Sequence, residues 1–124
     1  MKTLNQQNLN CITKTLKVNK MLSNKNDNIF VAGHNGMVGS AIIRRLKKEG
    51  FNNIITRNRD QLDLLNQKDV FNFFDDNKID ISIICAARVG GIYSNSTYPA
   101  NFVYQNLMIQ SNIINACHQK DVNN

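Results

Sequence analysis

Three glycines stand at every third position of one short stretch, Gly33, Gly36 and Gly39. An apolar run, Ile29–Ala32, precedes them, and a helix-period pattern follows. A strand, a glycine turn and a helix in this order form a site for a dinucleotide pyrophosphate, because the free N–H groups and partial positive charge of the helix start attract anions. Gly33 would allow a sharp turn, Gly36 a close approach of phosphates, and Gly39 close packing of helix and strand. The spacing departs from the standard Gly-x-Gly-x-x-Gly fingerprint, so an ordinary strand-to-helix turn is the alternative. The candidate phosphate-binding residues are Gly33, His34, Asn35, Gly36, Met37, Val38 and Gly39.

The charges after the second predicted strand bear on the identity of the nucleotide. An NAD site usually places a carboxylate there, to bind the ribose hydroxyls. Here no carboxylate precedes Asp60, and Arg57 and Arg59 flank the corner. Arginine suits the 2′-phosphate of NADP, and two solvated surface arginines are the alternative. Asp63 would accept a hydrogen bond from the adenine amino group with Leu64 against the ring, or would simply cap the loop.

Small residues end the third predicted strand, where Cys85, Ala86 and Ala87 would let a cofactor approach the backbone or would serve tight packing. The carboxyl end of the sheet, where ligands of such folds bind, continues into Arg88, Val89, Gly90 and Gly91. Arg88 would meet an anionic substrate group or be a surface charge. His34 and His118 have no carboxylate or cysteine at a convincing spacing, so neither a catalytic residue nor a metal site is predicted.

The periodicity predicts the elements that position these residues. Val38, Ala41, Ile42 and Leu46 would share the buried face of the first helix, and Gly50 stands where that helix should stop. The last helix opens at Tyr98-Pro99 and is apolar on more than one side, which is typical of a helix that packs against two partners. The order β-α-β-α-β-α predicts an α/β fold, the N-terminal part of a Rossmann-type doubly wound parallel sheet, incomplete, with the first strand as an unpaired edge. The predicted strands are 28–33, 53–56 and 80–87, and the predicted helices are 37–49, 67–77 and 98–118.

Length and charge bound the remaining possibilities. The chain has 124 residues, enough for one domain, with a net charge of +6. Residues 1–28 carry five lysines and one aspartate, so the basic charge belongs mostly to a segment expected to be a disordered extension, and residues 29–124 form a partial NAD(P)-binding domain. We expect neither nucleic-acid binding nor a membrane span. Three cysteines without Cys-x-x-Cys spacing fit a reducing compartment, the cytoplasm.

Four stretches, in order and in register, resemble the GDP-L-fucose synthases, a family of extended short-chain dehydrogenases/reductases. They are residues 31–41, 56–64, 86–92 and 97–107. The resemblance implies an NADPH-dependent enzyme that epimerises GDP-4-keto-6-deoxy-D-mannose at carbons 3 and 5 and then reduces its ketone, and a homodimer formed through the long last helix. It places residues 33–39 at the pyrophosphate, Arg59 at the 2′-phosphate, and Arg88, Val89, Gly90 and Gly91 along the substrate cleft. The adenosine would be lined by Asp60, Gln61, Leu62, Asp63 and Leu64, and the cofactor would run past Ala86 and Ala87.

The chain departs from the family pattern at three points. Asn35 stands where an arginine is usual, which leaves NADP against NAD open, and Arg88 replaces a usual lysine. The family's catalytic serine, Tyr-x-x-x-Lys pair, cysteine and histidine come later in its sequence, and no Tyr-x-x-x-Lys occurs here. The prediction is therefore an N-terminal part of such an enzyme, inactive alone. A small non-catalytic NADP-binding module and a remnant that does not fold stably are the alternatives.

Overall fold

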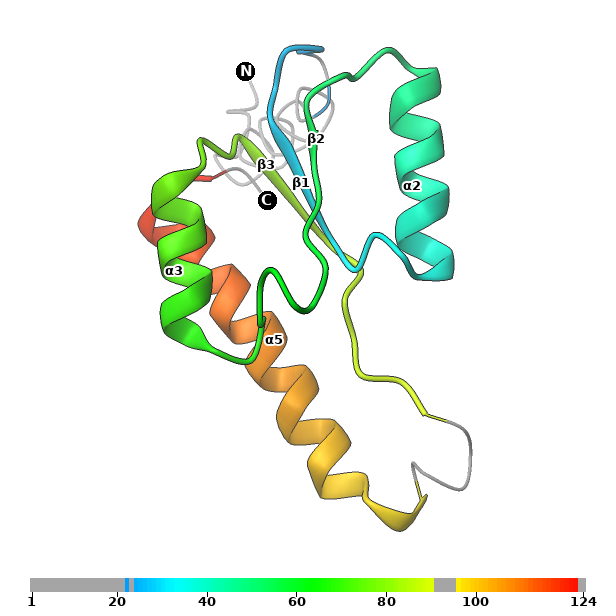
Figure 1. Cartoon of the computed structure of the whole chain (residues 1–124), viewed down its shortest axis with the longest axis vertical. Helices are drawn as coiled ribbons and strands as arrows, with labels where there is room; N and C mark the ends of the chain where they lie inside the picture. The colour runs from blue at the N-terminus through cyan, green and yellow to red at the C-terminus, as the bar shows by residue number, and fades with distance from the viewer. Residues whose placement is uncertain (1–21, 23, 91–95, 123–124) are drawn as a thin grey trace, which may run out of the picture.

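The computed structural model describes residue 22, residues 24–90 and residues 96–122. Its elements follow the predicted β-α-β-α-β-α order and differ from the predicted bounds by up to three residues (Figure 1). The largest difference is at Cys85–Ala87, which leave the third strand and enter the loop after it. The elements are β1 (Ile29–Ala32), α2 (Met37–Lys48), β2 (Ile54–Ile55), α3 (Gln67–Asp76), β3 (Ile81–Ile84) and α5 (Pro99–Gln119).

The strands form one parallel sheet in the order β2–β1–β3, so the predicted α/β fold with a parallel sheet is confirmed. Ile29 pairs with Ile54 on one side and with Ile81 on the other. The expectation that β1 is an unpaired edge is wrong. The connection through α3 carries the chain back across the sheet to the free side of β1, so β2 and β3 are the edges among the described strands.

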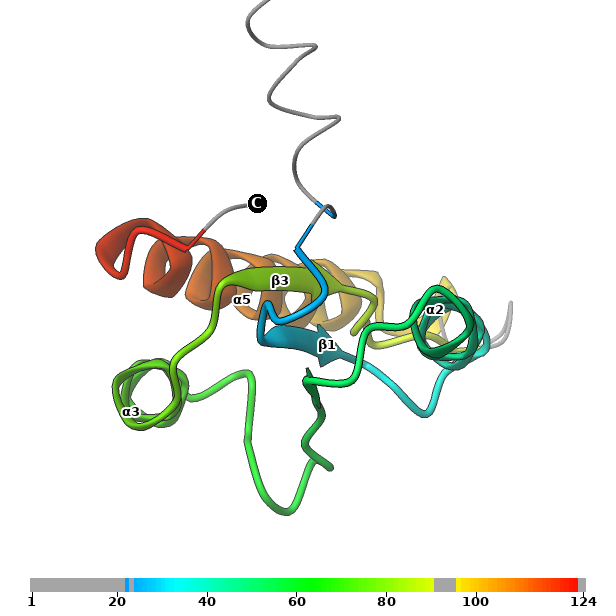
Figure 2. The ribbon, with the colours of Figure 1, turned by 90° about the horizontal axis from the view of Figure 1, so that it is seen from above.

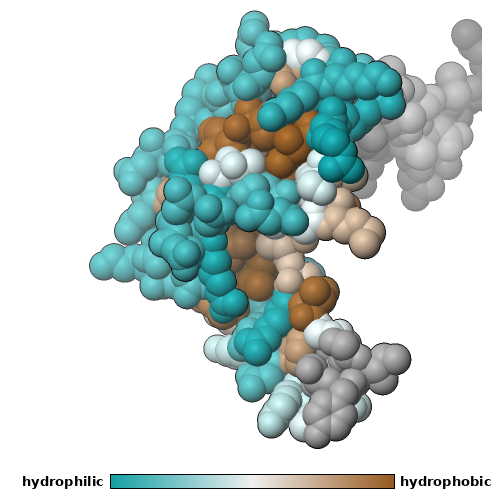
Figure 3. Space-filling view, turned by 45° about the vertical axis from the view of Figure 1, so that its right-hand side comes forward, coloured by the Kyte–Doolittle hydropathy of each residue, from teal (hydrophilic) through white to brown (hydrophobic). Residues whose placement is uncertain are grey.

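Side chains of β1 alternate between two apolar layers, as a strand buried on both faces requires. Ile29 and Val31 lie in the cluster that α2 covers, while Phe30 and Ala32 lie in the cluster that α3 and α5 cover. The two ribbon views accordingly show α2 and α3 on opposite sides of the sheet (Figures 1 and 2). Apolar surface interrupts the hydrophilic surface on the side that brings α2 forward (Figure 3).

The buried face of α2 is rotated from the predicted one. Leu46 is buried as expected, but Val38 is 62% exposed and Ala41 is also exposed. Gly39 is buried instead, because the first turn of the helix packs against the glycine turn through backbone rather than through an apolar side chain. Gly50 has a φ of +86°, the left-handed conformation expected after a helix end.

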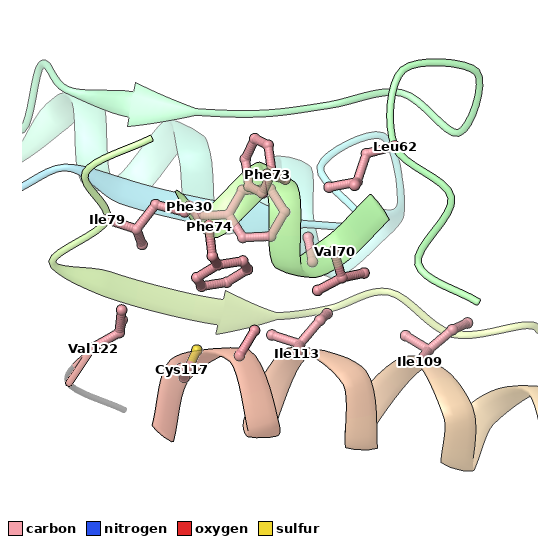
Figure 4. Packing of buried hydrophobic residues seen from close by; sticks show 12 residues of the cluster. Phe30, Leu62, Val70, Phe73, Phe74, Ile79, Ile109, Ile113, Cys117 and Val122 are labelled. Atoms are coloured by element: carbon pink, nitrogen blue, oxygen red, sulfur yellow. The ribbon is translucent and has the colours of Figure 1, made fainter. Parts of the chain in front are cut away.

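The larger cluster is built around three aromatic rings. The Phe30 ring centroid lies 4.8 Å from that of Phe73 and 5.9 Å from that of Phe74, in tilted and edge-on arrangements that favour aromatic pairs. The buried face of α3 is Val70, Phe73 and Phe74, as its periodicity predicts. Asn66 caps this helix by accepting hydrogen bonds from the backbone N–H groups of Lys68 and Asp69. Figure 4 shows these side chains facing those of α5.

Helix α5 buries one side and exposes another. Ile109, Ile113, Ala116 and Cys117 face the cluster, while Val103, Leu107 and Ile114 are each more than half exposed. Pro99 occupies the first turn, as predicted. No helix in the described part of the chain is long and apolar enough to cross a membrane.

The N-terminal extension lies mostly outside the described residues, since only residue 22 and residues 24–28 of it are placed. Asn28 anchors the start of β1, because its backbone N–H donates to Asp80 Oδ2 at 2.9 Å and its side-chain amide donates to the same oxygen at 3.2 Å. Disorder over residues 1–28 stays a prediction.

Candidate functional site

The glycine turn after β1 has the geometry that its spacing predicts, with one change of partner. Gly33 has a φ of +81°, and a Cβ there would lie 2.5 Å from the backbone nitrogen of Ala86. The turn is therefore tight against the end of β3, not only against itself. A Cβ on Gly39 would collide with the carbonyl oxygen of Gly33, so the close packing at Gly39 is against the turn that follows β1.

The start of α2 presents its backbone donors without a protein partner at the cap. Gly36 is the N-cap residue, has no side chain to accept a hydrogen bond, and the first turn contains no acidic residue. A Cβ on Gly36 would make only a 3.4 Å contact with the Gly33 carbonyl oxygen. Space in front of this helix end is therefore kept by the absence of a side chain, which suits an anion.

A cavity of about 290 Å³ lies where the loops after the three strands meet. This is the carboxyl edge of the parallel sheet, where the loops that follow neighbouring strands converge. Two side chains of α5, Gln105 and Ile109, complete it. Sequence reasoning did not find these two, because no local pattern places a helix 20 residues downstream beneath the loops. The other lining residues are Gly33, His34, Asn35, Gly36, Arg57, Asn58, Arg59, Leu62, Asp63, Leu64, Leu65, Cys85, Ala86, Ala87 and Arg88.

Most of the sequence-predicted residues line this cavity, and a few do not. Met37 and Val38 are exposed on α2, and Gly39 is buried behind the turn. Asp60 and Gln61 lie in the loop after β2 but not on the cavity wall. Val89 and Gly90 line a second hollow, between the segment after β3 and α5. Gly91 lies outside the described residues.

The two arginines after β2 differ in what holds them. Arg57 Nη1 donates to the Thr56 carbonyl oxygen at 2.8 Å, and its guanidinium lies 5.2 Å from the centre of the Phe73 ring. The Arg59 side chain lines the cavity and has no hydrogen bond or ion pair with any residue in the described ranges. Arg59 is therefore the cation of this corner that is available to an anion.

Asparagine side chains hold the loop after β2 in place. Asn35 Nδ2 donates to Asn58 Oδ1 at 3.1 Å and so joins the loops after β1 and β2. The Asn58 backbone N–H donates to Gln61 Oε1 at 2.9 Å. Asp63 Oδ1 accepts from the Leu65 N–H at 3.0 Å, which gives this carboxylate the capping role that was the alternative to adenine binding. Its other oxygen has no hydrogen bond from the described residues.

Arg88 is held by three residues of one face of α5. Its backbone N–H donates to Asn106 Oδ1 at 2.7 Å, and Asn106 Nδ2 donates back to the Arg88 carbonyl at 3.0 Å. Arg88 Nη1 donates to Gln105 Oε1 at 2.6 Å, and its guanidinium lies 5.4 Å from the centre of the Phe102 ring. Arg88 thus forms the ridge between the 290 Å³ cavity and the second hollow.

The thiols near the site are poor nucleophiles. Cys85 lines the cavity, and burial raises the pKa of its thiol. Burial likewise raises the pKa of Cys117, and the Ser82 hydroxyl lowers it by less, although the two side chains do not meet hydrogen-bond geometry. Within the described ranges no three histidine, cysteine, aspartate or glutamate side chains gather as metal ligands do. The arrangement can bind and orient an anionic nucleotide, because its donors are backbone N–H groups and a free guanidinium.

Sequence comparison relates the chain to sugar-nucleotide enzymes. It is 55% identical over 95 residues to the GDP-L-fucose synthase of Escherichia coli (strain K12), covering 77% of this chain and 30% of that protein. It is 48% identical over 101 residues to GDP-L-fucose synthase 1 of Arabidopsis thaliana, covering 82% of this chain and 31% of that protein. The chain thus spans under a third of the length of these two curated relatives.

Solved structures share the fold and, by their titles, the cofactor. The structure titled DdhaC has a TM-score of 0.78 and 45% identity, covering 80% of this chain and 28% of its own. A GDP-mannoheptose C4 reductase from Campylobacter jejuni with NADP bound has a TM-score of 0.76 and 38% identity, covering 80% and 31%. A GDP-L-fucose synthetase from Naegleria fowleri bound to NADP has a TM-score of 0.69 and 26% identity, covering 80% and 32%.

The match to a family profile spans the whole of the predicted cofactor-binding region. It covers residues 29–124, from the first residue of β1 through the glycine turn and the cavity to α5 and beyond. The chain therefore belongs to the NAD dependent epimerase/dehydratase family.

Proposed function

We propose that this chain is the cofactor-binding part of a GDP-L-fucose synthase and that it binds NADP(H). The observation that carries the proposal is the single cavity in which the bare N-terminus of α2 and the unpaired Arg59 face one another's loops. The 55% identity to the E. coli enzyme supports this assignment over other members of the family. The whole protein would convert GDP-4-keto-6-deoxy-D-mannose to GDP-L-fucose by 3,5-epimerisation and 4-keto reduction.

The residues present fit this cofactor. The space that a Cβ on Gly36 would narrow lies in front of free N–H donors, which suits the pyrophosphate. Arg59 is free to bind the 2′-phosphate, and Leu62 and Leu64 offer apolar surface to the adenine. Asn35, where the family has arginine, donates to Asn58 instead and leaves Arg59 as the principal cation for the 2′-phosphate.

Bound NADPH supplies the hydride for the ketone reduction, and the described residues orient it. Ala86 lies against Gly33 and closes the floor of the cavity, so the cofactor passes over backbone there. Arg88, fixed by Gln105 and Asn106, stands at the rim where a sugar nucleotide would enter. The proton donor for the reduction is proposed to come from the Tyr-x-x-x-Lys pair of the whole protein, which this sequence does not contain.

The second half of the proposal concerns partners and compartment. The exposed apolar residues Val103, Leu107 and Ile114 of α5 form the face through which the whole protein would dimerise. The substrate partner would be a GDP-sugar. The unpaired thiols of Cys85 and Cys117 support a reducing, cytoplasmic location.

Binding of 2′,5′-ADP and 5′-AMP to the purified 124-residue chain tests the cofactor assignment, because these two ligands differ only in the 2′-phosphate. Calorimetry should show tighter binding of 2′,5′-ADP by about 10- to 100-fold, the range of charge-assisted hydrogen bonds. Arg59→Ala should abolish the preference. Arg45→Ala is the matched control, because Arg45 pairs with Glu49 at the far end of α2. Equal affinity of the unmodified chain for both ligands would overturn the NADP assignment.

A non-catalytic NADP-binding module is the second candidate, favoured by the absence of Tyr-x-x-x-Lys from the sequence. Both candidates bind NADPH, so turnover separates them from an active enzyme. The 124-residue chain with NADPH and GDP-4-keto-6-deoxy-D-mannose should show no loss of absorbance at the nicotinamide band. Measurable oxidation of NADPH would refute the proposed inactivity of this chain. The intact mass of the protein from its source cells would then separate a part of a longer enzyme from a separate module.

A further inference from the structure

Asn112 is a buried polar residue on the apolar face of α5. Its residue surface is 3% exposed, and its neighbours on the buried side are Ile109, Ile113 and Ala116. Burial of an amide in an apolar layer is unfavourable unless hydrogen bonds replace its lost contacts with water. An apolar side chain would suit this layer better, so the amide needs a reason for its presence.

The hydrogen bonds of Asn112 reach a loop about 48 positions earlier in the chain. Its Nδ2 donates to the Leu64 carbonyl at 2.9 Å and to the Leu65 carbonyl at 3.2 Å. The other hydrogen bonds of residues 57–65 within the described ranges are local to that loop, apart from the exposed contact between Asn35 and Asn58. Asn112 is therefore the buried tie between this loop and the rest of the fold.

This loop forms one wall of the nucleotide cavity. Leu62, Asp63, Leu64 and Leu65 all line it, and Ile109, one turn before Asn112 on α5, lines it from below. A donor that holds two successive carbonyls sets the direction of the backbone between them. That direction decides where the side chains of Asp63 and Leu64 stand relative to the cavity.

We propose that Asn112 is a positioning residue for the adenosine end of the site, an inference that rests on the proposed nucleotide binding. Asn112 touches no ligand itself. It acts through the carbonyls of Leu64 and Leu65, which hold the adenine wall against α5. Loss of the amide leaves both carbonyls without their donor, and the wall then relaxes to recover hydrogen bonds with water.

The two arms of the nucleotide separate this role from that of Arg59. Asn112 acts on the wall that receives adenine, which 5′-AMP and 2′,5′-ADP share. Asn112→Ala should weaken both ligands by the same factor, about 5- to 20-fold for a lost buried hydrogen bond. Arg59→Ala should weaken 2′,5′-ADP alone. A purely structural role for Asn112 would lower the melting temperature and leave both dissociation constants of the folded protein unchanged.

Asn115→Ala is the matched control. Asn115 stands one turn further along α5, is half-buried, and has no hydrogen bond from its side chain in the described structure. Both substitutions raise helix propensity by the same amount, so propensity cancels in the comparison. Asn112→Ser keeps a short donor and should recover part of the affinity. If Asn112→Ala does not fold, the comparison of Asn112→Ser with the unmodified chain carries the test.

Hydrogen exchange in the absence of ligand provides a second readout. Asn112→Ala should speed exchange of the backbone amides of residues 62–66 and leave those of β1 unchanged, and Asn115→Ala should change neither. Equal dissociation constants and equal exchange in the variant and the unmodified chain would overturn the positioning role while nucleotide binding stands. Failure of the unmodified chain to bind either ligand would overturn the proposed function and this inference together.

Discussion

Replacement of Gly33 by alanine tests how closely the glycine turn approaches β3. The residue combines a positive φ of +81° with a close neighbour, because a Cβ would lie 2.5 Å from Ala86 N and 2.7 Å from the carbonyl carbon of Cys85. All the atoms that it would meet are backbone, so no side-chain rotation relieves the overlap. The hydrogen bond from Cys85 N to the Ala32 carbonyl oxygen, at 2.8 Å, holds that backbone in place.

Gly50 provides the control, since it shares the conformation without the neighbour. Its φ is +86°, and a Cβ there would meet nothing within 4 Å. Gly50→Ala should therefore cost only the left-handed conformation, about 1–2 kcal/mol. Gly33→Ala should cost that amount and an overpacking term of about 1–3 kcal/mol, giving a total of about 2–5 kcal/mol. The difference between the two variants isolates the steric overlap.

Urea denaturation followed by circular dichroism measures both losses of unfolding free energy, with the slope against denaturant checked for constancy. Gly33→Ala should also weaken NADPH binding, because relief of the overlap moves Cys85–Ala87, which line the cavity. Gly50→Ala should leave NADPH affinity unchanged. Equal destabilisation by the two substitutions would show that the turn does not press on β3, and the close approach described above would be refuted.

Three further predictions concern the core, the thiols and the outer face of α5. Phe30→Ala should lower the unfolding free energy by about 3–5 kcal/mol, because Phe30 is 1% exposed between two aromatic rings; a loss below about 1 kcal/mol in urea denaturation would contradict this packing. Burial raises the pKa of Cys117, so the folded state holds the thiol proton to higher pH than the unfolded state does. The unfolding free energy should therefore be unaffected by this group below the ordinary thiol range and should fall as pH rises through it; Cys117→Ala should flatten the decline, and an unchanged slope would refute the assignment. Leu107→Lys should shift any dimer of the chain toward monomer in analytical ultracentrifugation, since Leu107 is 58% exposed on α5, and a dimer of unchanged affinity would place the contact elsewhere.

Local patterns were sufficient for the elements and for much of the candidate site. The apolar run Ile29–Ala32, the glycine spacing and the periodicity of Val70, Phe73 and Phe74 each act within a few residues of chain, so sequence alone predicts strand, turn and helix. The loops after parallel strands converge at one edge. For that reason Gly33, Arg59 and Ala86, which are far apart in sequence, could be assigned to one site.

Roles that depend on distant neighbours required the tertiary structure. Arg57 and Arg59 are equivalent in sequence, and only the packing of Arg57 on Phe73 shows that Arg59 is the available one. The many asparagines carry no local pattern, yet Asn106 and Asn112 reach carbonyls 18 and about 48 positions away.

What the sequence by itself determined is the order of elements, the glycine turn and the family to which the chain belongs. What only the tertiary structure decided is that β1 is the central strand, that Gly33 is needed because of Ala86, and that α5 holds two walls of the cavity. The physical reason is one of range. Helix and strand periodicity repeats within two to four residues, whereas strand order and buried hydrogen bonds depend on which surfaces meet after the chain has folded.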